Sequence, residues 1–209
     1  MAISHNGRFG FVTNHPLGFT DDPDAKAEDG PNAVTVIDLV SRNPRVIEQI
    51  ELPPYPVMAD IHPDGRRVLV GGGHFFHVLM VNEKTKKVSV ARYEFPLFIT
   101  GFDVSPSGSR IIATGTESPR KNGNLFVAWD AAVHTFEWVK GSIRYQGKVG
   151  DGEFTKPLNG PFSPRFGPTG KRAFVLNGLG LSPRGELDDL VVIDLSGEKP
   201  CVSDLVRQL

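Results

Sequence analysis

The sequence has almost no cysteine and no excess of either charge. Cys201 is the single cysteine in 209 residues, which excludes an internal disulfide, and no Cys/His spacing suited to a structural zinc occurs. With 23 Lys+Arg against 24 Asp+Glu and no block of like charges, the chain lacks the clustered basic residues that nucleic acids or anionic membranes require. We therefore expect no nucleic-acid partner.

Long apolar runs and export signals are missing as well. No stretch approaches the roughly 18 apolar residues of a membrane span, and the segment MAISHNGRFGFV lacks a basic part followed by an apolar one. We expect no membrane span and no signal peptide in this chain, and its compartment stays open. No Gly-x-Ser-x-Gly elbow, phosphate-cradling loop or dinucleotide fingerprint occurs. Cys201 is predicted to be a buried small hydrophobe rather than a nucleophile.

The features that are present indicate β-structure. Short runs of β-branched or aromatic residues, bounded by Gly, Pro, Asn or Asp, cover the chain, and no segment has a convincing helical period. The chain is therefore predicted to be all-β. A short strand, a tight turn ending in glycine and a second strand recur four times, with the turn glycines at Gly7, Gly65, Gly108 and Gly170. Glycine supplies the positive φ that such a hairpin turn needs.

Each turn is followed by a third strand that ends near Asp or Asn, and then by a fourth strand. The third strands are predicted at 34–38, 78–82, 125–130 and 190–194, and the fourth at about 46–50, 88–91, 135–139 and 201–205. The shortest repeat runs 17 residues from Gly65 to Asn82 and 26 more to Gly108. Four strands in about 40–45 residues is the size of one β-propeller blade.

The first repeat resembles a known family. Phe11-Val12-Thr13-Asn14, followed by Asn32-Ala33-Val34-Thr35-Val36-Ile37-Asp38-Leu39, is similar to the YVTN-type β-propeller repeat. In the later copies, Val70-Gly71-Gly72 and Ala113-Thr114-Gly115 replace the second-strand motif, and Val175-Leu176-Asn177 keeps half of it. The resemblance implies the propeller fold and no particular activity, because the superfamily includes lactonases, quinoprotein and haem-domain relatives, surface-layer proteins and binding platforms.

We predict one β-propeller domain over residues 1–209, with four-stranded antiparallel blades at about 1–52, 53–92, 93–140 and 141–209. Propellers of the family that the chain resembles usually have about seven blades, so four blades form a partial or half propeller. Either the four blades close on themselves, or another chain or self-association covers the end blades, or the chain is a piece of a longer protein. A start in an innermost strand at Met1 favours the last two outcomes.

Blade topology places the long loops on one rim, where we expect a ligand to bind. These loops join second to third strands at 15–32, 71–76, 116–123 and 178–188, and adjacent blades at 51–57, 92–100 and 141–161. The candidate ligand residues on this rim are His15, Asp21, Asp22, Asp24, His74, Glu117, Arg120, Asp151, Glu153 and Arg184. The alternative is that these are ordinary charged loop residues. His74 and His77 lie three apart on a strand, so they point to opposite faces, and one is expected to pack beside Phe75 or Phe76.

One loop suggests a cofactor. Residues 20–29 contain five carboxylates, including Asp21, Asp22 and Asp24, and carboxylate oxygens are ligands that Ca²⁺ or Mg²⁺ prefers. A divalent cation is therefore the cofactor that this loop would hold. The loop lacks the EF-hand spacing, which favours the alternative of a solvated acidic loop.

Three functions stay open. The preferred one is a binding or scaffold module whose loop rim recognises a protein or small-molecule ligand. A divergent or incomplete metal-dependent lactonase-like hydrolase is the second, and a half-propeller that is functional only as a homo-oligomer is the third. Because no catalytic residue can be named from the sequence, the non-enzymatic function is preferred.

Overall fold

A computed structural model of the chain describes residues 1–14, 32–52, 56–117, 132–149, 161–177, 189–197 and 199–206. The described residues form β-strands and no helix, which confirms the all-β prediction. A helix with the length and hydropathy to cross a membrane is accordingly not found in these ranges. The chain divides into two compact units, Met1–Glu94 and Phe95–Leu209.

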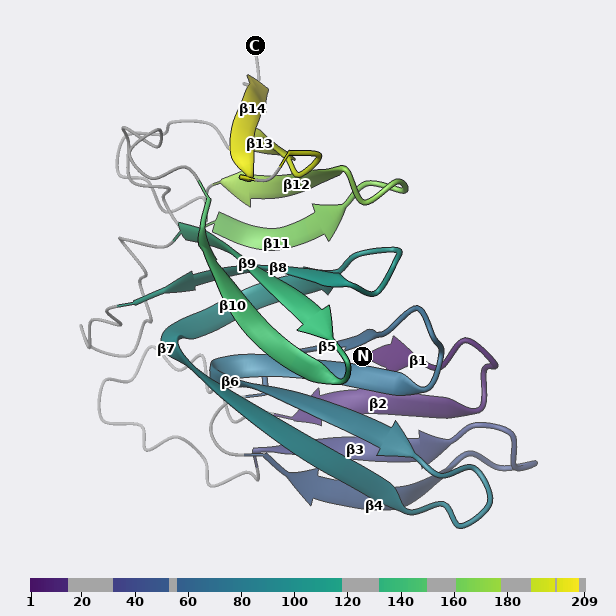
Figure 1. Ribbon diagram of the computed structural model, residues 1–209. Helices are drawn as coiled ribbons and strands as arrows, with labels where there is room; N and C mark the ends of the chain where they lie inside the picture. The colour runs from purple at the N-terminus through teal and green to yellow at the C-terminus, as the bar shows by residue number, and fades with distance from the viewer. Residues whose placement is uncertain are drawn as a thin grey trace, which may run out of the picture. The chain divides into compact units, whose positions relative to one another are not determined.

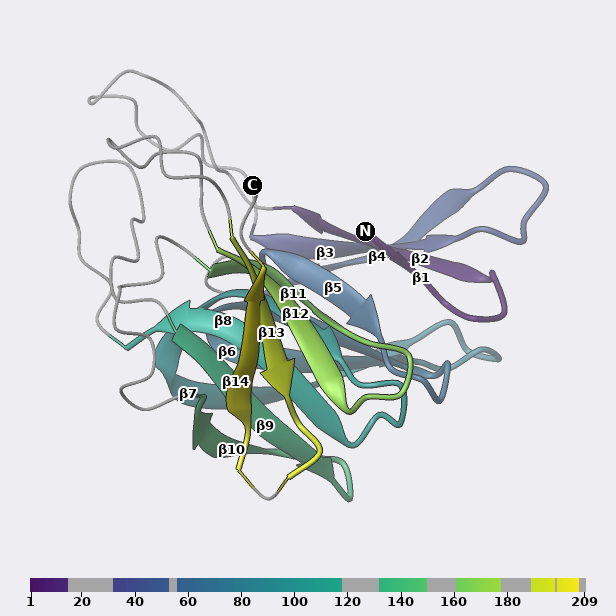
Figure 2. The ribbon, with the colours of Figure 1, turned by 90° about the horizontal axis from the view of Figure 1, so that it is seen from above.

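The first and last groups of four strands each form one antiparallel sheet in sequence order (Figures 1 and 2). The first sheet contains β1 (Ala2–Ile3), β2 (Phe9–Asn14), β3 (Ala33–Asp38) and β4 (Arg45–Glu51). The last sheet contains β11 (Pro161–Phe166), β12 (Arg172–Asn177), β13 (Asp189–Asp194) and β14 (Cys201–Val206). Four antiparallel strands in consecutive order are the layout of a propeller blade. We call these sheets the first and last blades.

In the sequence between these two blades, six strands form one sheet in the order β10-β9-β8-β7-β6-β5. Its strands are β5 (Met58–Ile61), β6 (Arg67–Val81), β7 (Val88–Val104), β8 (Arg110–Thr116), β9 (Ala132–Val139) and β10 (Ser142–Lys148). The predicted loops at 71–76 and 92–100 are wrong, because these residues belong to β6 and β7. The three glycines that suggested a loop lie inside β6, where Gly73 has a φ of 56° and allows an irregular strand.

The third repeat also differs from the prediction. Residues 135–139, expected to be a fourth strand, belong to the third strand β9, and the fourth strand is β10, within the expected loop 141–161. The backbone explains the difference. The Trp138 N–H donates to the Ser109 carbonyl at 2.8 Å, just as the Leu39 N–H donates to Arg8 and the Leu195 N–H to Lys171. Glu137 therefore occupies the repeat position of Asp38 and Asp194, and Asp130, which suggested the end of a third strand, lies outside the described residues.

The four repeated turns have one conformation. Gly7, Gly65, Gly108 and Gly170 have φ values of 67°, 69°, 73° and 69°. Each glycine N–H donates to the carbonyl three residues earlier, at 2.8, 2.8, 2.8 and 2.9 Å respectively. The predicted positive-φ hairpin turn is thus confirmed in all four repeats.

Each unit has its own apolar core, formed where neighbouring sheets face each other through alternate strand residues. In the first unit, residues of the first blade pack on β5 and β6; the buried members include Phe9, Phe11, Val34, Val36, Ala59, Val68, Val70 and Leu79. In the second unit, residues of β8 and β9 pack on the last blade; the members include Ile112, Val133, Ala173, Val175, Val191 and Ile193.

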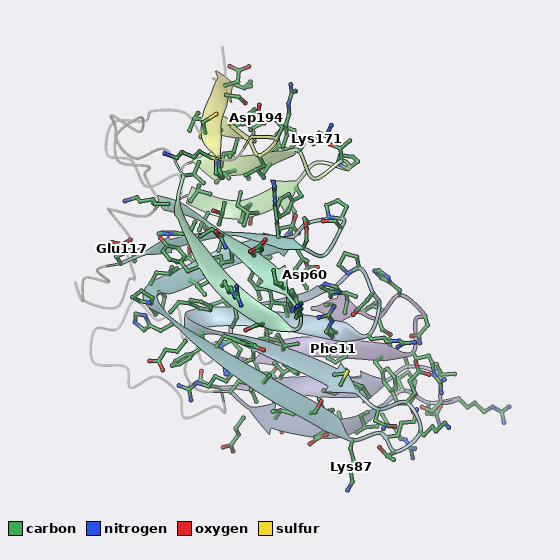
Figure 3. The ribbon with its side chains drawn as sticks, viewed as in Figure 1. Phe11, Asp60, Lys87, Glu117, Lys171 and Asp194 are labelled. Atoms are coloured by element: carbon green, nitrogen blue, oxygen red, sulfur yellow. The ribbon has the colours of Figure 1, made fainter. Side chains whose placement is uncertain are left out.

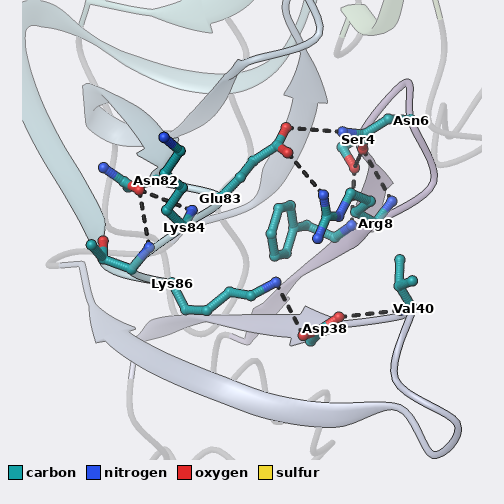
Figure 4. A network of polar contacts seen from close by, with 11 residues as sticks. Ser4, Asn6, Arg8, Asp38, Val40, Asn82, Glu83, Lys84 and Lys86 are labelled. Atoms are coloured by element: carbon teal, nitrogen blue, oxygen red, sulfur yellow. Dashed lines mark hydrogen bonds and ion pairs between the residues drawn. The ribbon is translucent and has the colours of Figure 1, made fainter.

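Polar contacts link neighbouring turns of the first unit (Figure 4). Asn6 Nδ2 and Arg8 Nη1 lie 3.1 and 3.0 Å from the two carboxylate oxygens of Glu83, and Lys86 Nζ lies 3.3 Å from Asp38. Exposed ion pairs such as Arg8–Glu83 contribute at most about 1 kcal/mol. We interpret this network as a cross-link between turns, at the end of the strands opposite the predicted ligand rim.

Candidate ligand-binding site

Strands β8, β9 and β10 bring polar side chains together at the end of their sheet that carries the long loops. His134, the third residue of β9, lies opposite Ala113 of β8 and Lys148 of β10. Its side chain is 1% exposed, and its Nδ1 atom lies 3.0 Å from the hydroxyl of Tyr145. Two arrangements satisfy this contact. Either the hydroxyl donates to Nδ1 and the ring proton is on Nε2, or Nδ1–H donates to the hydroxyl.

In both arrangements the Tyr145 hydroxyl bonds to Nδ1, and the other ring nitrogen, Nε2, takes no part in this hydrogen bond. Nε2 of His134 is buried and makes no hydrogen bond of acceptable geometry in the described part of the chain. Burial lowers the pKa of His134 and Lys148 lowers it further, whereas a hydrogen-bonding contact with the Gly115 backbone and the carboxylate of Glu117 act in the opposite direction. The lowered pKa favours the neutral ring, and the Gly115 contact does not give Nε2 a hydrogen bond of full geometry.

Glu117 is the predicted ligand residue that belongs to this group. It directly follows β8 and is exposed. Figure 3 shows Glu117 at the opposite end of the strands from Lys171, which lies in a repeated turn. The structure thus brings Glu117 near His134, which sequence reasoning did not single out. A single histidine in a strand has no spacing signal; the available cue was a polar residue on a strand face otherwise formed by Phe136 and Trp138.

A second aromatic and cationic group lies in the first unit. His77 is 5% exposed and its ring centroid is 5.9 Å from that of Phe75, which confirms that one of the two histidines packs beside a phenylalanine. The Arg92 guanidinium lies 3.7 Å from the Phe75 ring centroid. Burial, and then the charge of Arg92, lowers the pKa of His77 to about 4. His74, a predicted ligand residue, is half-buried in β6.

The other predicted ligand residues lie outside the described residues: His15, Asp21, Asp22, Asp24, Arg120, Asp151, Glu153 and Arg184. This set includes the carboxylates proposed to hold a divalent cation. Within the described ranges, no group of three or more His, Cys, Asp or Glu side chains could hold a metal ion.

The expected burial of Cys201 is wrong, because the residue is exposed. It begins β14, an outermost strand, and pairs on one side only, with Asp194. A residue at the start of an edge strand is not covered by a further strand.

The outer faces of the first and last blades carry exposed apolar side chains. In β12, Ala173 and Val175 belong to the core, while Phe174 and Leu176 on the opposite face are 36% and 48% exposed. In the first blade, Ile3 and Val46 share one cross-strand row and are 48% and 60% exposed.

Comparison with known proteins identifies the fold. No protein-family model matches the chain, and no curated protein matches it. A putative 6-phosphogluconolactonase from Bacteroides uniformis superposes with a TM-score of 0.66 at 14% identity, over 99% of this chain and 55% of that one. Kuenenia stuttgartiensis hydrazine synthase gives 0.58 at 18% identity, over 92% and 51%. The β-propeller domain of Cps50 (Swd1) from Myceliophteria thermophila gives 0.60 at 11% identity, over 99% and 57%.

At these identities the similarity shows the fold alone. The chain is an all-β, partial β-propeller, and it spans about half the length of the solved structures that it matches. The YVTN-type repeat stays a resemblance.

Proposed function

We propose that this partial propeller is a binding scaffold that holds a ligand at the loop end of β8–β10. The observation that carries the proposal is His134, a buried, neutral histidine with an unused Nε2 atom beside Glu117 and Lys148.

The stability of the fold gives no reason for this histidine. A buried polar atom without a partner costs about 1–3 kcal/mol, whereas a phenylalanine at the same position would have no such cost. On one side His134 contacts Tyr145, whose ring packs 5.3 Å from the ring of Phe136, so the surroundings suit an aromatic residue. Polar groups that lower the stability of the fold are typical of functional sites.

The chemistry of the group limits the ligand. When the Tyr145 hydroxyl donates to Nδ1, the Nε2–H of His134 and the ammonium of Lys148 are both donors, and they suit a carbonyl or carboxylate oxygen. Such an oxygen can belong to a small molecule or to a side chain of a protein. The candidates for further ligand contacts are the predicted loop residues His15, Asp21, Asp22, Asp24, His74, Glu117, Arg120, Asp151, Glu153 and Arg184.

Imidazole ¹⁵N NMR tests this proposal with a panel of small carboxylic acids and lactones as probes. We expect binders to shift the Nε2 resonance of His134, and His134→Phe to abolish their binding. His5→Phe is the matched control, because His5 is exposed and lies in the other unit. Binders that leave His134 unperturbed, or that bind His134→Phe equally well, would show that the site lies elsewhere.

A lactonase-like hydrolase is the alternative that shares this site. One of the similar structures is a putative 6-phosphogluconolactonase, although at 14% identity it supports the fold only. Glucono-1,5-lactone in a pH-stat distinguishes the two functions. The scaffold leaves the spontaneous rate of ring opening unchanged with and without Mn²⁺ or Ca²⁺, whereas a metal-dependent hydrolase accelerates it and gains melting temperature from the ion.

A half-propeller completed by a second copy is the other candidate, and the exposed Phe174 and Leu176 favour it. Two copies would together have about the length of the solved structures, of which this chain covers 55% and 57%. Equilibrium sedimentation at low micromolar concentration should then give a dimer that Leu176→Glu dissociates. Met80→Glu is the control, because Met80 is equally exposed, at 49%, on β6. A sharply melting species of monomer mass contradicts this candidate.

A further inference from the structure

The second unit contains a cavity that the proposed rim site does not use. Its volume is about 200 Å³, and it lies where β8, β9 and β10 face the last blade. Arg110, Glu137 and Gln146 line one side, and Phe166, Leu195 and Pro200 line the other. The first three residues are exposed, so the cavity opens to solvent on their side.

The first repeat shows one way in which this space is closed. Arg110 is the equivalent of Phe9, because Arg110 lies opposite Glu137 just as Phe9 lies opposite Asp38. Thr135 is the equivalent of Val36, because each lies two residues before that acidic residue of the third strand. Gln146 is the equivalent of Ile47, because each is the extra residue where the register shifts between third and fourth strands. Phe9, Val36 and Ile47 all belong to the apolar core of the first unit.

Arg110, Thr135 and Gln146 are polar, and all three line the cavity. The last blade has Arg172, Val192 and Ser203 at the same register positions. Arg110, Thr135 and Gln146 thus stand where an aromatic ring, a valine and an isoleucine close the corresponding space in the first unit. These three polar side chains around one cavity leave both the space and the polar groups that a ligand needs.

Glu137 also differs from the residues at the same position in the first and last repeats. Its equivalents Asp38 and Asp194 each accept the backbone N–H two residues later, from Val40 and Ser196 at 3.2 and 2.8 Å. Glu137 instead accepts from Gln146 Nε2 at 3.2 Å. Its carboxylate is therefore directed to the cavity wall rather than to its own turn.

We propose that this cavity binds a free α-amino acid with an apolar side chain. The guanidinium of Arg110 donates one N–H to the Leu195 carbonyl and retains further donors for the carboxylate of the ligand. The carboxylate of Glu137 and the amide oxygen of Gln146 accept from the ammonium group. Phe166, Leu195 and Pro200 contact the apolar side chain.

The size of the cavity agrees with this class of ligand. At roughly 30 Å³ of liquid volume per water molecule, 200 Å³ corresponds to about seven non-hydrogen atoms, close to the size of a small apolar amino acid such as valine or leucine. Drug-sized molecules and dinucleotides need pockets of about 300 Å³ or more.

Isothermal titration calorimetry with L-leucine tests the proposal, with 4-methylpentanoate and 3-methylbutylamine as analogues that each lack one charged group. We expect L-leucine to bind, and each analogue to bind at least about tenfold more weakly, because one ion pair is lost. Glu137→Gln should weaken L-leucine binding at least as much. Arg144→Gln is the matched control, because Arg144 pairs with Glu137 in β10 but does not line the cavity.

A further variant separates loss of the site from loss of the fold. Gln146→Ile restores the residue of the first repeat; we expect it to fill the cavity, melt at or above the wild-type temperature and no longer bind L-leucine. The proposal is overturned if L-leucine gives no binding heat at concentrations up to roughly 50 mM, where only very weak binding would be missed. It is also overturned if the analogues bind as well as L-leucine, or if Arg144→Gln weakens binding as much as Glu137→Gln. Each of these outcomes leaves the proposal for His134 untouched.

Discussion

Replacement of Gly65 by valine tests the repeated turn. Gly65 has a φ of 69°, and a Cβ atom built on it would lie 3.3 Å from the Cβ of His5. An L-residue in the left-handed region costs about 1–2 kcal/mol, and a β-branched residue costs more. We therefore expect Gly65→Val to lower the free energy of unfolding by about 1–3 kcal/mol, which corresponds to roughly 2–4 °C of melting temperature per kcal/mol for a chain of this size.

Two further variants separate the causes. Gly7 has nearly the same φ, 67°, but no atom lies within 4 Å of a Cβ built there, so Gly7→Val measures the backbone strain alone. Gly65→Asn keeps the contact with His5 but tolerates a positive φ, and should cost less than Gly65→Val. Urea unfolding and differential scanning calorimetry measure all three. If the melting temperature of Gly65→Val lies within about one degree of the wild-type value, the strain argument is refuted.

Three other predictions concern pH, an inner strand and a loop. Because burial and Arg92 lower the pKa of folded His77 from 6.5 to about 4, the unfolded chain binds more protons between these values. The free energy of unfolding should therefore fall as the pH drops from 6.5 to 4, and His77→Phe should flatten this dependence in urea titrations. Asp103 accepts the Phe166 N–H at 2.6 Å, so Asp103→Ala should cost about 1–3 kcal/mol by the same method; an unchanged midpoint would contradict a stabilising bond. Changing the candidate metal ligands Asp21, Asp22 and Asp24 together to Asn should alter metal-free stability by less than about 0.5 kcal/mol, and unfolding of this variant would make the loop structural.

The sequence predicted the local structure best where one residue has a strong backbone preference. The four turn glycines follow from φ alone. Strands β2 and β3 were placed correctly because they are runs of apolar and β-branched residues that end at Asn14 and Asp38. The prediction failed in the third repeat, where Glu137 replaces the aspartate that marks the end of a third strand.

The sites were harder to predict because they depend on register between strands. The pairing of His134 with Tyr145 requires knowing that β9 and β10 are adjacent, with a shift at Gln146. The cavity requires knowing which positions are equivalent across repeats, and a misplaced third strand conceals that Gln146 stands at the position of Ile47. The loop residues were identifiable by composition, but composition does not show which of them come together.

The unfolding free energy of the double variant His134→Phe/Tyr145→Phe tests the central claim most directly. If the polar pair serves a ligand, replacing both partners by apolar rings of similar shape removes the unused Nε2 atom and leaves no new unpaired group. Urea denaturation should then give a free energy within about 1 kcal/mol of the wild type, or higher, while binding at the rim is lost. A loss of more than about 2 kcal/mol would show that the pair is part of the structural core and would contradict the proposed site.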